Sequence, residues 1–90
     1  MSNTTVLSYI KRPVVVQAIK YDGTNEKEVM AFLGPDYVAN SVATRDGAIF
    51  VQTLEGVVIA SVGDFLIRGI KGEHYPCKPD IFQATYDLVQ

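Results

Sequence analysis

Apolar and polar residues follow one another in short runs along the chain, and most runs end at a turn signal. Residues 14–21 are rich in β-branched side chains and are mostly apolar on both faces of an alternating pattern, which predicts a central strand. Residues 7–9 are expected to pair at a sheet edge. Three turn signals, Asp46-Gly47, Glu55-Gly56 and Gly63-Asp64, separate the later runs at 37–44, 48–53, 57–60 and 65–70. Connections this short cannot join parallel strands, so they predict an antiparallel meander.

A helical period replaces this pattern at residues 26–33. Asn25 and Glu28 have the spacing of a capping box, in which side chains satisfy the free backbone donors at a helix start. Gly34 followed by Pro35 predicts the helix end. The stripe that would pack on the sheet consists of Val29, Phe32 and Leu33.

Pro79 beside Asp80 predicts a short C-terminal helical turn, because both residues suit the first turn of a helix. Together the elements predict one α+β domain over residues 1–90, with residues 1–6 flexible. A twisted antiparallel sheet of five or six strands would pack against helix 26–33. The expected core is Val14, Val16, Ala18, Val29, Phe32, Leu33, Ile49, Val51, Val57, Ile59, Phe65, Ile67 and Phe82.

The composition favours a compact globular protein and gives no indication of a membrane, secreted or non-specifically DNA-binding protein. A chain of 90 residues supports one core, and its 48% apolar and 20% charged residues fit a compact globule. The longest apolar runs are far shorter than a membrane helix, and no secretory signal is expected. A single cysteine agrees with a reducing compartment, so the cytoplasm is predicted. A net charge of −2 does not favour non-specific binding to duplex DNA.

His74 and Cys77 are the residues that could carry chemistry. They could supply two metal ligands, but a closed zinc site needs four, usually with more cysteine or histidine. They could also form a nucleophile and its base, but no third residue is evident that would orient the histidine. We therefore expect no catalytic residue, no metal site and no cofactor.

A group of basic and aromatic residues is the candidate ligand-binding surface. Arginine and lysine bind phosphates and aromatic rings stack on bases, so these residue types suit a nucleotide. The alternative is a solvated sheet edge with Tyr75 in the core. The group consists of Arg68, Lys71, His74, Tyr75 and Lys78, with Lys20 and Tyr21 from the first strand.

Two stretches carry a family resemblance. Residues 11–23 contain a basic pair, Pro-Val, a strand, an aromatic residue and a Gly turn, and residues 61–65 are followed downstream by Phe82, Thr85 and Tyr86. This combination resembles the small phage- and prophage-encoded PGDYG family. The chain has Val62 and Phe65 where the motif has Pro and Tyr, but it keeps Gly63-Asp64. The resemblance implies a phage origin and a small α+β fold, and it transfers no catalytic residue.

These observations favour a non-enzymatic phage accessory protein that acts by binding in the host cytoplasm. The first hypothesis is counter-defence, in which a homo-oligomer sequesters a host nucleotide-derived immune signal. The alternative is direct inhibition of a host defence enzyme or nuclease through protein contacts. A third possibility is a minor virion or assembly component. The high apolar fraction of a small chain makes self-association an expectation under each of them.

Overall fold

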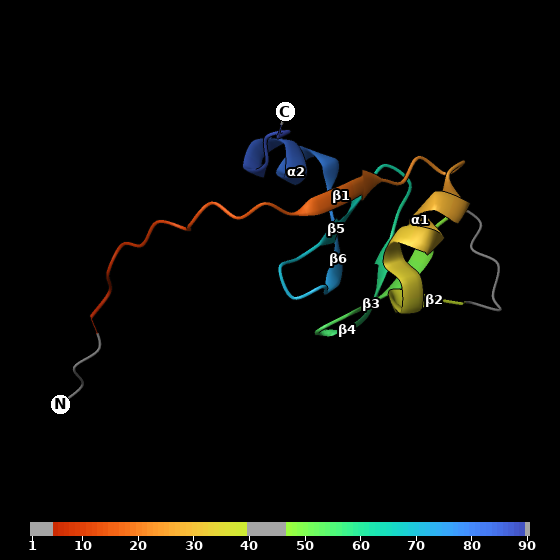
Figure 1. The fold of residues 1–90 in the computed structure, drawn as a ribbon, viewed down its shortest axis with the longest axis horizontal. Helices are drawn as coiled ribbons and strands as arrows, with labels where there is room; N and C mark the ends of the chain where they lie inside the picture. Colours follow the sequence, from red (N-terminus) through yellow and green to blue (C-terminus); the bar gives the residue numbers. More distant parts are fainter. Residues whose placement is uncertain (1–4, 40–46, 90) are drawn as a thin grey trace.

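The protein is described by a computed structural model that covers residues 5–39 and 47–89 (Figure 1). The described residues form an α+β fold with antiparallel strands, which confirms the predicted fold class. In chain order the elements are β1 (Gln17–Lys20), α1 (Glu26–Leu33), the 3₁₀ turn η1 (Gly34–Asp36), β2 (Tyr37–Val38), β3 (Ile49–Thr53), β4 (Gly56–Ala60), β5 (Phe65–Arg68), β6 (His74–Cys77) and α2 (Pro79–Thr85).

The strands divide between two three-stranded sheets rather than joining in one. Sheet A has the order β1-β5-β6 and sheet B the order β2-β3-β4, with β6 packed against β3 and β4. The connection after β4 explains the division. The Gly63 amide donates to the Tyr21 carbonyl at 2.6 Å, and the Tyr21 amide donates to the Asp64 carbonyl at 2.9 Å. These two hydrogen bonds hold the connection between β4 and β5 beside the end of β1. As a result, β5 pairs with β1 and does not pair with β4 as a meander would require.

The Gly63-Asp64 turn has the role that the sequence predicts. Gly63 has a φ of 100°, a conformation that glycine adopts without strain. The Asp64 carboxylate accepts the Ser61 amide proton at 2.9 Å and so fixes the turn that precedes β5. This local prediction is confirmed.

The core lies between α1 and the two sheets. Seven buried residues form its central cluster: Tyr21, Val29, Leu33, Ile49, Val51, Ala60 and Leu66. Of the predicted core, the buried members are Val29, Leu33, Ile49, Val51 and Ile67. The half-buried members are Val16, Phe32, Phe65 and Phe82. The prediction is wrong for four residues that the structure exposes: Val14, Ala18, Val57 and Ile59.

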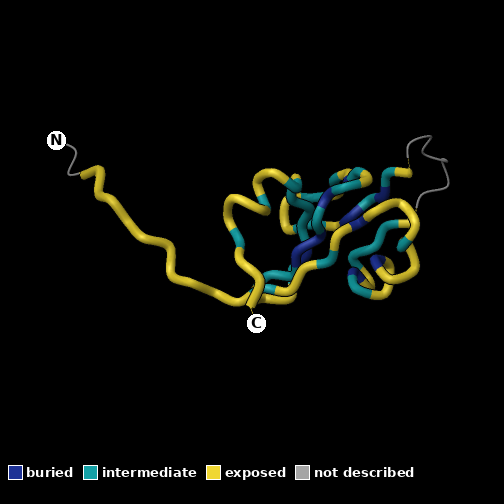
Figure 2. Tube along the Cα trace, turned by 90° about the horizontal axis from the view of Figure 1, so that it is seen from above, coloured by how far each residue is buried: buried dark blue, intermediate teal, exposed yellow. Residues whose placement is uncertain are grey.

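Residues 5–16 form an extended N-terminal arm that leaves the folded body (Figures 1 and 2). The predicted strand at 14–21 is shortened to β1, which is an edge strand and not a central one, and residues 7–9 form no strand. The register explains why. Gln17 is opposite Arg68, the last residue of β5, and the chain turns at Gly69, so residues 14–16 have no partner strand there.

The helices agree with the predicted boundaries, but one cap differs. Asn25 makes no side-chain cap to α1; its amide group instead donates to the Lys20 carbonyl at 2.8 Å. Its side-chain oxygen accepts the Asp22 amide proton, so Asn25 stabilises the turn before the helix rather than a capping box. α2 starts at Pro79 as predicted. Neither helix in the described part of the chain is long and apolar enough to cross a membrane.

The predicted hairpin at Asp46-Gly47 and the second half of the run 37–44 fall largely on residues 40–46, outside the described residues. The expected antiparallel pairing is nevertheless visible on either side of that gap. Tyr37 lies opposite Val51, and Val38 lies opposite Phe50.

Candidate binding surfaces

Arg68 is the centre of a polar network inside the fold. Gln17, Arg68 and His74 are cross-strand neighbours and form one row across sheet A. The Arg68 guanidinium donates to the Gln17 side-chain oxygen at 2.5 Å and to the Phe32 carbonyl at 2.8 Å. It also lies 4.4 Å from the centroid of the Phe32 ring, within the range of a cation–π contact. Both terminal nitrogens of this guanidinium therefore donate to acceptors of the protein itself.

His74 is buried, with 7% of its surface exposed, and both ring nitrogens have partners. Its Nε2 lies 3.3 Å from Nε of Arg68, and its Nδ1 lies 2.7 Å from the Asp36 carboxylate. Arginine can only donate, so Nε2 must be the acceptor and the ring proton must sit on Nδ1. Asp36 thus orients His74, a role for which the sequence provided no candidate.

Lys78 forms an ion pair with Asp64. Its ammonium group lies 3.1 Å from both carboxylate oxygens, and Asp64 is only 3% exposed. A buried carboxylate needs compensation for lost hydration, and Lys78 together with the Ser61 amide provides it. This ion pair therefore links the Gly63-Asp64 turn to Lys78, the residue directly before α2.

The other residues of the predicted surface lie apart from one another. Tyr21 is in the core, where its hydroxyl donates to the Gly47 carbonyl at 2.5 Å. Lys20 and Lys71 are exposed. Tyr75 is half-buried, and burial together with hydrogen bonding to Tyr86 raises its pKa to about 12.

Strand alternation explains why the group does not form one surface. Cross-strand register places Gln17, Arg68 and His74 on one face of sheet A, and Ala18, Ile67 and Tyr75 on the other. Successive residues His74 and Tyr75 therefore point in opposite directions. A single ligand cannot contact both side chains from one face of this sheet.

Cys77 does not pair with His74. The two residues are three positions apart on β6, so their side chains leave opposite faces of the strand. The Cys77 thiol contacts the Lys78 carbonyl at 3.6 Å, and burial raises the pKa of the thiol. A raised pKa disfavours the thiolate that a nucleophile or metal ligand requires. Among residues 5–39 and 47–89, no three metal-ligating side chains of His, Cys, Asp or Glu come together.

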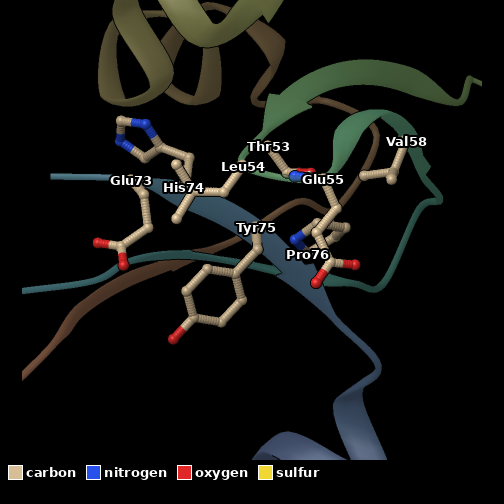
Figure 3. Close-up of a pocket in the computed structure, with 8 residues that line it drawn as sticks. All are labelled: Thr53, Leu54, Glu55, Val58, Glu73, His74, Tyr75 and Pro76. Atoms are coloured by element: carbon tan, nitrogen blue, oxygen red, sulfur yellow. The ribbon is translucent and has the colours of Figure 1, made fainter. Parts of the chain in front are cut away.

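An acidic groove separates the β3–β4 hairpin from β6 (Figure 3). Its volume is about 390 Å³, at the lower end of the range for ligand sites. The carboxylates of Glu55 and Glu73 are its charged groups, and the described residues that line it include no lysine or arginine. Figure 3 shows these two carboxylates on either side of Tyr75. The lining consists of Thr53, Leu54, Glu55, Val58, Glu73, His74, Tyr75 and Pro76.

Sheet B has a second apolar face, directed away from the core. The register places Val38, Phe50 and Ile59 in one row across its three strands. Gln52 and Val57 form the next row on the same face. Ile59 is 58% exposed, whereas its neighbours Val58 and Ala60 point toward the core. We call this surface, made of Val38, Phe50, Gln52, Val57 and Ile59, the outer face of sheet B.

Comparisons with known proteins add no family to this description. No protein-family model matches the chain, and searches of curated proteins and of solved structures found no match.

Proposed function

We propose that the protein acts by binding another protein, and that the outer face of sheet B is the contact surface. The observation that carries this proposal is the apolar row of Val38, Phe50 and Ile59 on the face turned away from the core, where Val38 and Phe50 are half-buried and Ile59 and the adjacent Val57 are exposed. Antiparallel sheets with one covered face usually present polar residues on the other. Contiguous apolar surface on a small protein is typical of interaction sites.

The geometry gives less support to a nucleotide ligand. Arg68 donates to protein acceptors, and Lys78 is paired with a buried carboxylate. A phosphate would have to compete with these internal partners, and the loss of a partner from buried Asp64 would be costly. The groove offers no alternative phosphate site, because Glu55 and Glu73 would repel a phosphate.

The resemblance to phage-encoded proteins makes a bacterial host protein the natural partner. In that setting, covering a functional surface of a host enzyme is sufficient for inhibition, and the phage protein needs no catalytic group. Sequestration of a nucleotide signal remains a prediction from the residue types of the basic and aromatic group. The two functions can be distinguished by the molecule that the tagged protein retains: an inhibitor should retain a protein, and a sequestering protein should retain a nucleotide.

A paired capture experiment tests the proposal. Tagged wild-type protein, Ile59→Lys and Ile81→Lys are incubated with lysate of the host bacterium, and bound proteins and small molecules are both identified by mass spectrometry. Ile81 is a matched control, because it is 57% exposed but lies on α2. We expect one protein to be retained in stoichiometric amount by wild type and Ile81→Lys and to be lost with Ile59→Lys.

Two outcomes would contradict the proposal. Equal retention of the same protein by all three chains would show that the outer face of sheet B is not the contact surface. Retention of a nucleotide, without any protein partner, would favour sequestration instead.

A further inference from the structure

The N-terminal arm combines exposed apolar side chains with two adjacent cations. Val6 and Ile10 are 96% and 95% exposed, and Lys11-Arg12 follow directly. Protein surfaces tolerate single exposed apolar residues, but an extended segment that contains many of them gains by burying them against a partner. The other large apolar residues that the arm exposes are Leu7, Tyr9, Val14 and Val15.

The acidic groove has the complementary character. Leu54, Val58 and Pro76 provide apolar walls, while Glu55 and Glu73 provide negative charge. Glu73 already accepts the Lys71 amide proton at 3.0 Å, which holds its carboxylate in place and leaves further acceptor sites free. An extended segment with apolar side chains next to a cationic pair matches such a groove in both polarity and charge.

We propose that the arm of one copy occupies the acidic groove of a second copy. In this arrangement Lys11 and Arg12 lie beside the carboxylates of Glu55 and Glu73, and apolar side chains of the arm pack on the groove walls. Each chain offers one arm and one groove. Reciprocal exchange therefore closes a twofold dimer, and a head-to-tail exchange closes a ring.

The topology favours a second copy over the chain's own groove. The arm continues from β1, at one edge of sheet A, whereas the groove lies along β6, at the opposite edge. The arm also runs away from the folded body (Figures 1 and 2). Self-association of this kind does not use the outer face of sheet B, so it is independent of the proposed function.

Charge reversal on each side of the contact tests the proposal by sedimentation velocity of the full chain. We expect wild type to self-associate, and Arg12→Glu or Glu55→Arg to weaken self-association on the order of tenfold or more. An equimolar mixture of the two variants should recover the wild-type assembly. In that mixture each arm meets a groove of opposite charge, which would not happen if each arm folded back on its own chain.

Matched controls reverse charges on α1. Lys27→Glu and Glu28→Arg change the same charges at exposed positions away from the arm and the groove, and both should assemble like wild type. Circular dichroism verifies folding, and Glu55→Gln provides a milder second variant if Glu55→Arg unfolds. Three results would overturn the proposal: a wild type that is monomeric up to about 1 mM, variants that assemble unchanged, or a mixture that stays monomeric.

Discussion

Arg68 provides the sharpest test of whether the basic residues stabilise the fold or bind a ligand. Replacing Arg68 with alanine removes the donors to Gln17 and Phe32, the stack on the Phe32 ring and the partner of His74. The hydrogen bond to the Phe32 carbonyl is partly buried and charge-assisted, and is worth about 1.5 kcal/mol. The exposed bond to Gln17 contributes about 0.5 kcal/mol, since solvent screens it.

The remaining contacts increase the effect. The cation–π contact adds about 0.5–1 kcal/mol, and leaving the buried His74 acceptor without a donor costs roughly another 1 kcal/mol. We therefore expect Arg68→Ala to lower the free energy of unfolding by about 3.5–4 kcal/mol, out of roughly 5–13 kcal/mol for a chain of this length. A loss of that size lowers the midpoint of thermal unfolding by about 14–32 °C.

Urea unfolding followed by far-ultraviolet circular dichroism measures this loss. Lys71→Ala is the control, because Lys71 is exposed and belongs to the same predicted surface. Arg68→Lys should lie between the two, because an ammonium group cannot reproduce the fork of donors. If Arg68→Ala unfolded at the same urea concentration as Lys71→Ala, the structural role assigned to Arg68 would be wrong.

Three further predictions concern the turn before β5 and the residues around β6. Lys78→Met should destabilise the protein by about 1–2 kcal/mol in urea unfolding, because it leaves the buried Asp64 carboxylate without its cation while Lys78 itself is largely exposed; an unchanged midpoint would contradict this. Tyr75 has a pKa raised to about 12 by burial and by Tyr86, so the folded state holds this proton more tightly than the unfolded state. The raised pKa of Tyr75 therefore contributes to stability fully below about pH 10, and this contribution is lost as the pH rises toward 12. Absorbance titration of the tyrosines at 295 nm should show that Tyr75→Phe removes the phenol that ionises at the highest pH. The raised pKa of Cys77 predicts slower reaction with a disulfide reagent at pH 8 in the folded protein than in urea, and equal rates would contradict it.

The sequence was sufficient to predict those features of the fold, namely turns and helix boundaries, that depend on residues adjacent along the chain. Gly63-Asp64 predicted the turn before β5, because the positive φ of Gly63 and the short reach of the Asp64 carboxylate to the Ser61 amide are local features. Helix 26–33 and the helix start at Pro79 followed from periodicity and from the conformational limits of proline. These elements needed no knowledge of tertiary contacts.

The candidate site could not be predicted in the same way, because it depends on strand register. Arg68, His74 and Tyr75 are close in sequence, but alternation separates His74 and Tyr75, and the register joins Arg68 to Gln17, 51 positions away. Asp36 reaches His74 across 38 positions, so the residue that orients the histidine was not recognisable. Lys78 was predicted to bind a ligand, whereas in the fold it pairs with the buried carboxylate of Asp64.

The outer face of sheet B did have a signal in the sequence. Residues 57–60 are all apolar, so their own pattern does not decide which of them point inward. The turn at Leu54-Glu55 places Gln52 opposite Val57, and a polar residue on the partner strand indicates the outward face. Hairpin register therefore predicts that Val57 and Ile59 point outward, although both were listed in the expected core.

Photo-crosslinking in bacterial cells measures directly whether the outer face of sheet B contacts another protein, as proposed. A photoreactive amino acid is incorporated at position 59 in one chain and at position 81 in another, two sites of nearly equal exposure on different surfaces. We expect a crosslink to one bacterial protein from position 59 and none from position 81. A crosslink from position 81 alone would contradict the proposed contact surface. The absence of any protein crosslink from position 59, in cells that contain the folded protein, would also contradict it.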